Sequence, residues 1–208
     1  KKGHKNMGKF IKRFSRVIAV VLAAVLVFNI SGNVDAAKKK KTVVIYFSAT
    51  GTTKSVANKI KKASNGTLVE IKAAQPYTDA DLNWSNSSSR VTKEHESASN
   101  PAKSSVRPKI SNLKQIQKAV KSADIVYIGY PIWWGEAPHI VYTLVENTNL
   151  KGKTVVPFST SLSSGMGNSG SNLKTKAIVS KKTKWNKGKG FYGKSNQKTV
   201  DNWVKTIK

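Results

Sequence analysis

The sequence contains no cysteine. That absence excludes disulfides, thiolate metal sites, cysteine nucleophiles and lipid attachment through cysteine. No cluster of histidine and carboxylate residues has the spacing of a metal site either, so we predict no bound metal. Any redox chemistry in this chain would therefore come from an organic cofactor.

Acidic residues are scarce: 10 Asp and Glu stand against 37 Lys and Arg among 208 residues, a net charge of +27. Almost all of the cations are Lys, whereas base recognition usually relies on the forked guanidinium of Arg. The composition does not favour nucleic acid as a partner, and it favours a solvated lysine surface over a dedicated anion site. Hydrophobic residues make up 38% of the chain, enough for one globular core.

The N-terminal segment has the order of a secretory signal peptide. Four basic side chains between Lys9 and Arg16 precede an apolar run from Val17 to Phe28, and small residues follow near Ala36. The run is shorter than the roughly 20 residues that a spanning helix needs. We predict a signal peptide over 1–36, a basic linker over 37–41 and one domain over 42–208, exported to the cell envelope or beyond. A membrane anchor is the alternative if the segment is not cleaved.

After the linker, short β-branched apolar runs alternate with helical patterns, which is typical of a parallel sheet with helices on both faces. Strands are predicted over 42–47, 67–71, 125–129, 154–158 and 188–192. Helices are predicted over 53–63, 111–122 and 138–146, from about 171, and at the C-terminus, where Val200, Trp203, Val204 and Ile207 share one face. A long polar segment, 72–108, interrupts this alternation and is typical of a functional or disordered loop.

The first predicted strand is followed directly by Ser48-Ala49-Thr50-Gly51-Thr52-Thr53 and then by a helix. A phosphate at that position would meet unpaired backbone N–H groups, the positive end of the helix dipole and several hydroxyls. The loop has neither the Gly-Lys-Ser/Thr ending of a triphosphate loop nor the glycines of a dinucleotide motif, so it suits a phosphate monoester. An ordinary capped turn is the alternative.

Two more loops follow strands of the same predicted sheet. Tyr130 to Pro138 contains Trp133-Trp134-Gly135, and two adjacent Trp side chains cannot both enter the core, so at least one is available to pack on a flat ring. Ser159 to Ser169 contains small residues and two glycines that let the backbone lie close to a ligand. In an open parallel sheet these loops meet at one end, near the switch point of the strand order.

These three loops together resemble the FMN-contacting loops of the flavodoxin family, particularly its exported bacterial members, and the resemblance extends from Thr42 to the C-terminus. The segment from Asp81-Leu82-Asn83-Trp84 to Arg107-Pro108 is similar to the long loop of that subgroup. The resemblance implies a flavodoxin-like three-layer α/β sandwich with a five-stranded parallel sheet in the order 2-1-3-4-5 and FMN at the switch point. The residues implied to bind FMN fall into three groups: Ser48, Thr50, Gly51, Thr52 and Thr53 at the phosphate; Pro131, Ile132, Trp133, Trp134 and Gly135 on the isoalloxazine ring; Thr160, Ser161 and Gly165 on its other side.

The function implied by this resemblance is an FMN-dependent redox protein, either an electron carrier or a reductase of a quinone-like acceptor. Typical flavodoxins are acidic, so the partners of this basic chain cannot be carried over from them. His139 and Glu136 are the ionisable residues nearest to the Trp pair, but a satisfied capping or surface role is expected for His139. The alternative function is non-redox binding of anionic cell-envelope polymers on the same scaffold.

Overall fold

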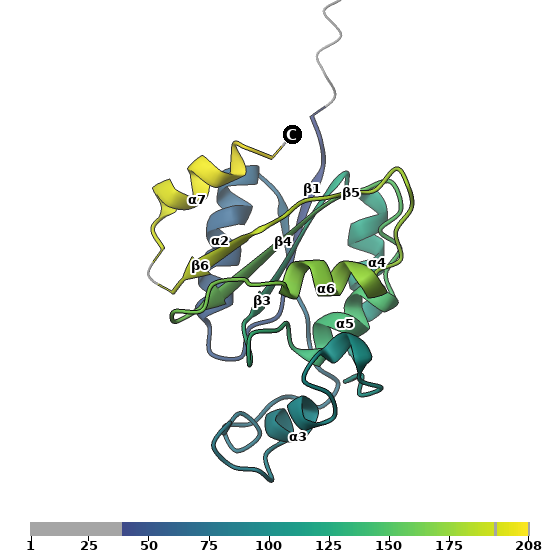
Figure 1. The fold of residues 1–208 in the computed structure, drawn as a ribbon. Coiled ribbons are helices and arrows are strands. Elements are labelled where there is room, and N and C mark those ends of the chain that lie inside the picture. The colour runs from purple at the N-terminus through teal and green to yellow at the C-terminus, as the bar shows by residue number, and fades with distance from the viewer. Residues whose placement is uncertain (1–38, 194, 208) are drawn as a thin grey trace, which may run out of the picture. The chain divides into compact units, whose positions relative to one another are not determined.

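The structure, a computed structural model, describes residues 39–193 and 195–207 (Figure 1). The predicted signal peptide and the first two residues of the predicted linker lie outside the described residues. Among the described residues, no helix has the length and apolar character needed to cross a membrane.

One parallel sheet forms the centre of the domain. Its strands are β1 (Thr42–Tyr46), β2 (Thr67–Glu70), β3 (Ile125–Pro131), β4 (Thr154–Ser161), β5 (Lys184–Trp185) and β6 (Lys189–Tyr192). The order is β2-β1-β3-β4-β5, and β6 also pairs with β4 beyond β5, so β5 and β6 together occupy the fifth position. The predicted order 2-1-3-4-5 is confirmed, but the fifth strand is interrupted at Gly188, where φ is +80°.

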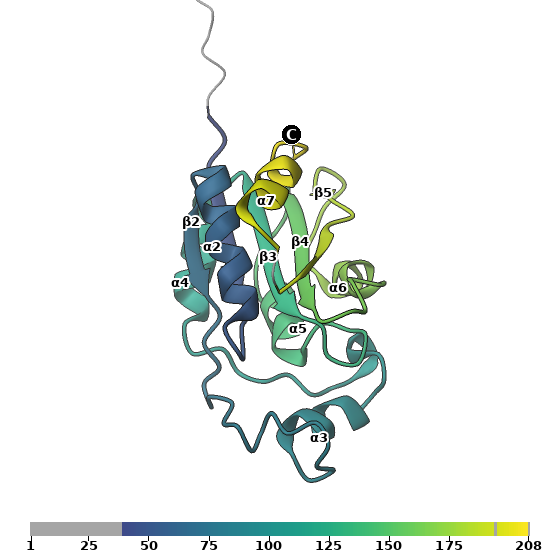
Figure 2. The ribbon, with the colours of Figure 1, turned by 90° about the vertical axis from the view of Figure 1, so that its left-hand side faces the viewer.

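Helices cover both faces of this sheet, because the side chains of each strand alternate between the faces. In β1, Val44 and Tyr46 pack with α2 (Thr52–Ser64) and α7 (Gln197–Val204). Val43 and Ile45 belong to the core on the other face, which includes α4 (Leu113–Ser122), α5 (His139–Glu146) and α6 (Ser169–Lys176). Figures 1 and 2 show the resulting three layers, so the predicted sandwich is confirmed.

The long polar segment 72–108 is ordered into a cap at one end of the sheet. It contains α3 (Arg90–Glu96) and the 3₁₀ helix η1 (Pro101–Lys103), neither of which the sequence pattern predicts. Figure 2 places α3 beyond one end of β3 and β4, at the end of the domain opposite to the C-terminus. The segment is therefore positioned to form part of a site at the carboxyl ends of the strands.

Candidate functional site

A cavity of about 550 Å³ lies at the carboxyl ends of the strands. The strand order reverses between β1 and β3, which is the switch point where open α/β sheets bind ligands. The cavity is lined mainly by apolar side chains from all three predicted loops and from the long segment: Ala49, Thr50, Leu82, Trp84, Val91, Ile132, Trp133, Trp134 and Leu162. The fold thus brings together the loops that the sequence predicts as one site.

The loop after β1 leaves the start of α2 open. Gly51 occupies the N-cap position with φ +84° and has no side chain that could cap the helix, and no atom lies within 4 Å of a Cβ built at this residue. The N–H groups of Thr52 and Thr53, in the first helical turn, have no intrahelical acceptor. Ser48 Oγ accepts from the Lys54 N–H at 3.2 Å and holds the loop against the helix. An anion at this position would meet both unpaired donors and the helix dipole.

The hydroxyls of this loop face different ways. Thr50 is exposed, and its Oγ1 lies 3.5 Å from that of Thr52. Thr53 is buried instead, and its Oγ1 lies 2.8 Å from Thr160 Oγ1 on β4. Thr53 and Thr160 therefore join α2 to the sheet through their hydroxyls, and the Thr53 backbone N–H is the group left for an anion. The predicted ligand contacts of these two side chains remain predictions.

The loop after β3 is a tight turn. Trp133 and Glu136 exchange two backbone hydrogen bonds of 3.0 Å, and both residues between them have positive φ, +47° for Trp134 and +80° for Gly135. Two such angles are characteristic of a type I′ turn, which favours Asn or Gly over a bulky aromatic residue. The turn therefore holds Trp134 in a strained conformation at its tip.

The two tryptophans have different surroundings. Trp133 packs edge-on against Phe47 and Tyr77, with both pairs of ring centroids 5.7 Å apart. Trp134 is 40% exposed, and its indole stacks on the His95 ring of α3. Both side chains line the cavity, but Trp133 is anchored in the core, whereas Trp134 stands at the rim.

The loop after β4 closes another side of the site. The Ile132 N–H donates to the Thr160 carbonyl at 2.9 Å, and Pro131 lies opposite Thr160 in the strand register, which ties this loop to the Trp turn. The Ser161 hydroxyl accepts from the Gly165 N–H at 2.9 Å, and Gly165 has φ +65°. Between them Leu162 is 99% exposed at the cavity wall. This apolar side chain is one that the sequence reasoning missed.

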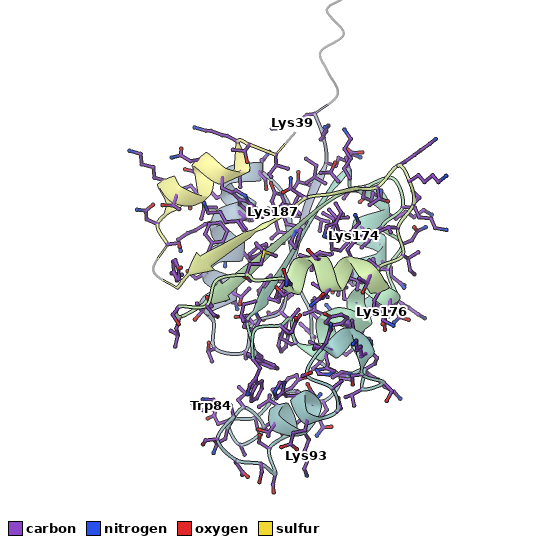
Figure 3. All side chains as sticks on the ribbon, viewed as in Figure 1. Lys39, Trp84, Lys93, Lys174, Lys176 and Lys187 are labelled. Atoms are coloured by element: carbon purple, nitrogen blue, oxygen red, sulfur yellow. The ribbon has the colours of Figure 1, made fainter. Side chains whose placement is uncertain are left out.

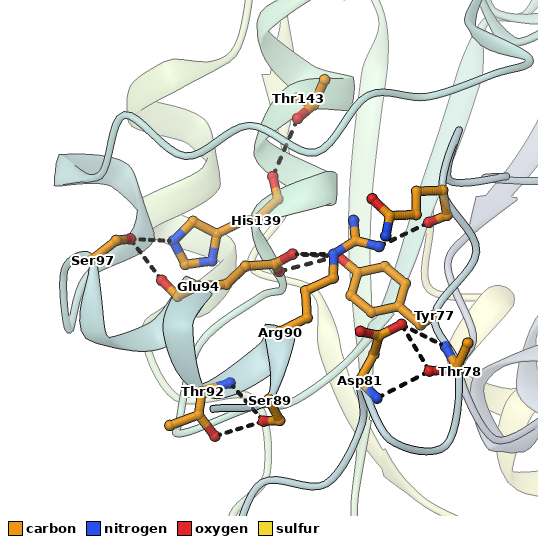
Figure 4. A network of polar contacts seen from close by, with 11 residues as sticks. Tyr77, Thr78, Asp81, Ser89, Arg90, Thr92, Glu94, Ser97, His139 and Thr143 are labelled. Carbon is orange, nitrogen blue, oxygen red and sulfur yellow. Dashed lines mark hydrogen bonds and ion pairs between the residues drawn. The ribbon is translucent and has the colours of Figure 1, made fainter. Parts of the chain in front are cut away.

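A polar network joins α3 to Tyr77 within the long segment (Figure 4). Tyr77 donates to the Glu94 carboxylate at 3.0 Å, and Arg90 pairs with the same carboxylate at 2.9 Å while its guanidinium lies 3.9 Å from the Tyr77 ring centre. Because Tyr77 also packs on Trp133, this network fixes α3 beside the cavity. The segment contributes Leu82, Trp84 and Val91 to the lining, none of which was predicted as a site residue.

His139 and Glu136 are turned away from the lining. His139 is 4% exposed, with Nε2 3.4 Å from Ser97 Oγ, and burial, with Arg107 and His95 nearby, lowers its pKa to about 4. Glu136 accepts from Asn172 Nδ2 at 2.6 Å, and burial raises the pKa of its carboxyl. Neither residue lines the main cavity, so the arrangement offers them no direct contact with a ligand there.

The fold and the cluster of loops at its switch point define a flavodoxin-like α/β protein. The family described as Flavodoxin matches residues 41–207, and the chain belongs to this family. No curated protein matches the chain.

Several solved structures are similar to this domain. A Bacteroides eggerthii protein shares 40% identity over 81% of this chain and 98% of its own, with a TM-score of 0.66. A Bacteroides uniformis protein shares 38% identity over 81% of this chain and 99% of its own, with a TM-score of 0.67. Both of these Bacteroides proteins are assigned as flavoproteins. A Lactobacillus acidophilus flavoprotein in complex with FMN shares 21% identity over 79% of this chain and 98% of its own, with a TM-score of 0.50. At this identity the similarity shows a shared fold alone.

Proposed function

We propose that this protein binds FMN in the cavity at the switch point and transfers electrons through it. The observation that carries the proposal is an apolar cavity of about 550 Å³ whose lining includes Ala49 and Thr50, in the loop that leads into the open N-terminus of α2. A flat ring system and a phosphate monoester need these two environments side by side. The assignment of two similar Bacteroides structures as flavoproteins adds support.

The phosphate would be held by the first turn of α2. The N–H groups of Thr52 and Thr53 and the hydroxyls of Thr50 and Thr52 are the donors available there, and the helix dipole favours a dianion. Gly51 permits close approach because it has no side chain and a left-handed backbone.

The ring would lie between the Trp turn and the loop after β4. Trp133 and Ile132 supply the wall that is anchored in the core, and Trp134, Leu162 and the long segment exclude water from the rest. Bound FMN would supply the electron chemistry. The chain's own contribution would be to bind and orient the cofactor.

This proposal specifies the chemical class of the electron donors and acceptors, not their identity. We propose a carrier of electrons, or a reductase of a quinone-like acceptor, working outside the cytoplasm as the predicted signal peptide implies. Anaerobic reduction followed by addition of a quinone would distinguish the reductase from a carrier that needs a protein partner. Terminal sequencing of native protein should place its first residue near Ala37 or Lys38.

Equilibrium dialysis against FMN tests the central proposal. Protein refolded with FMN should be yellow after dialysis and should quench the flavin fluorescence, because an aromatic wall lies against the ring. Riboflavin, which lacks the phosphate, should be retained more weakly. Protein that retains no FMN at micromolar concentration would overturn the proposal.

A further inference from the structure

A group of lysines lies at the end of the sheet opposite to the cavity. Four segments meet at the amino ends of the parallel strands, 39–41, 121–124, 150–154 and 180–184, and together they hold nine lysines and one aspartate. The long segment 72–108 at the cavity end holds five Lys and Arg and four Asp and Glu. The two ends of the domain therefore differ in charge, and the field of the lysine end would attract an anionic partner.

Backbone hydrogen bonds join these four segments into a fixed platform. Asp124 and Ile125 donate their N–H groups to the Lys41 carbonyl, and Lys184 donates to the Lys153 carbonyl at 2.9 Å. The Thr183 hydroxyl accepts from the N–H groups of Gly152 and Ser180 and donates to the Leu150 carbonyl. The lysines are therefore presented together by a preorganised surface rather than by loose loops.

Little on the protein neutralises these lysines. The single aspartate, Asp124, accepts from the backbone N–H of Lys41 at 2.8 Å. The two ion pairs within the described ranges join Arg90 to Glu94 and Arg107 to Glu146, and so involve no lysine of this end. A shallow cavity of about 270 Å³ is bordered by five lysines of the platform: Lys40, Lys151, Lys153, Lys182 and Lys184.

We propose that this lysine end docks on a bilayer surface rich in anionic lipid headgroups. The chain enters the domain there, at Lys39 (Figure 3), and residues 39–41 are all lysines. The apolar run that ends at Phe28 lies eleven residues before Lys39, a span of at most about 40 Å when extended. Retained, that run would hold the lysines within reach of a membrane, and after cleavage the lysines would act alone.

Docking in this orientation would direct the cavity away from the membrane. Figure 3 places Trp84, at the cavity rim, at the end of the molecule opposite to Lys39. This consequence rests on the proposed function: the electron partners would then approach from the aqueous side, as water-soluble proteins or small molecules. The docking itself requires no flavin and is measured without it.

The test measures binding of the full chain to phosphatidylcholine vesicles with and without phosphatidylglycerol. The variant Lys151→Gln/Lys182→Gln/Lys184→Gln removes three exposed charges of the platform. The matched control, Lys72→Gln/Lys93→Gln/Lys103→Gln, removes three exposed charges at the cavity end and leaves the net charge equal. Both variants keep the N-terminal segment, so a difference between their affinities for vesicles reports where on the domain the charge was removed.

The platform variant should lose on the order of a hundredfold in affinity for anionic vesicles, about fivefold per lysine, while the control variant changes little. Binding of the unsubstituted chain should weaken as salt is added. Equal losses in the two variants, or no loss in either, would overturn the proposal. The proposal would also be overturned if the platform substitutions weakened binding to single-stranded DNA more than they weakened binding to vesicles. Flavin retention is measured separately, so either proposal can fail alone.

Discussion

His95 lies flat against Trp134, with ring centroids 4.5 Å apart and planes 4° from parallel. The contact joins α3 of the long segment to the tip of the turn after β3. Trp134 has a φ of +47°, which is costly for an aromatic residue, and stacking on His95 helps to offset that cost. The rim of the cavity is thus held by a segment whose helix has no strong sequence pattern.

The first prediction separates the two tryptophans. Trp133→Ala should destabilise the flavin-free protein by about 3 kcal/mol, because Trp133 packs on Phe47 and Tyr77. Trp134→Ala should cost less than about 1 kcal/mol, since that side chain stands at the rim and the substitution removes little packing. Urea unfolding of the two variants measures both values. Equal losses would show that Trp134 is as much a part of the core as Trp133.

The second prediction concerns pH. Burial lowers the pKa of His139 from 6.5 to about 4, so between these values the unfolded chain binds a proton that the folded chain does not. The contribution of His139 to stability is therefore present above pH 6.5 and is lost as the pH falls to about 4. We expect this loss of stability to be about 2 kcal/mol.

The control for this prediction is His139→Gln. Burial raises the pKa values of Glu94 and Glu136, so their contributions act in the opposite direction, falling as the pH rises above the ordinary carboxyl range. Both carboxyls are kept in the variant. The difference in unfolding free energy between the two proteins should therefore shrink from pH 7 to pH 4. A difference that is constant over this range would contradict a buried neutral imidazole.

The central strands could be predicted because each carries a local signal, whereas their order was implied by the resemblance to the flavodoxin family. β1, β3 and β4 up to Phe158 are mainly apolar runs, and α2 and α4 have one apolar face each. The interrupted fifth strand was predicted only in part, since β5 has just two residues, Lys184 and Trp185, and no periodicity. α3 was missed because it contains one apolar side chain, Val91, and is held by distant partners such as Tyr77.

The position of the candidate site could be predicted from the sequence, but the role of each side chain in it could not. Loops that follow parallel strands must meet at one end of the sheet, which is a consequence of topology. Nothing in the chain order indicates that the Thr53 hydroxyl reaches Thr160, 107 residues away, or that Trp134 stacks on His95. These orientations are set by tertiary packing, which a local pattern does not encode.

The last prediction tests the phosphate loop against the ring wall. Thr50→Val/Thr52→Val keeps the side-chain shapes and removes two hydroxyls at the open end of α2, and hydrogen bonds to a charged group contribute about 1.5–3 kcal/mol each. FMN affinity should fall sharply while riboflavin affinity changes little, because riboflavin lacks the phosphate. Thr53→Val, one position along, is the matched control. The Thr53 hydroxyl bonds to Thr160, so its loss should leave the ratio of the FMN and riboflavin affinities unchanged.

The double substitution Trp133→Ala/Trp134→Ala should weaken the binding of FMN and of riboflavin together, since the ring is common to both ligands. The affinities of the unsubstituted protein and of each variant for both ligands are measured by titrating flavin fluorescence. If the Thr50 and Thr52 substitutions weakened FMN and riboflavin equally, the loop from Ser48 to Thr53 would not be the phosphate site, even in a protein that binds flavin.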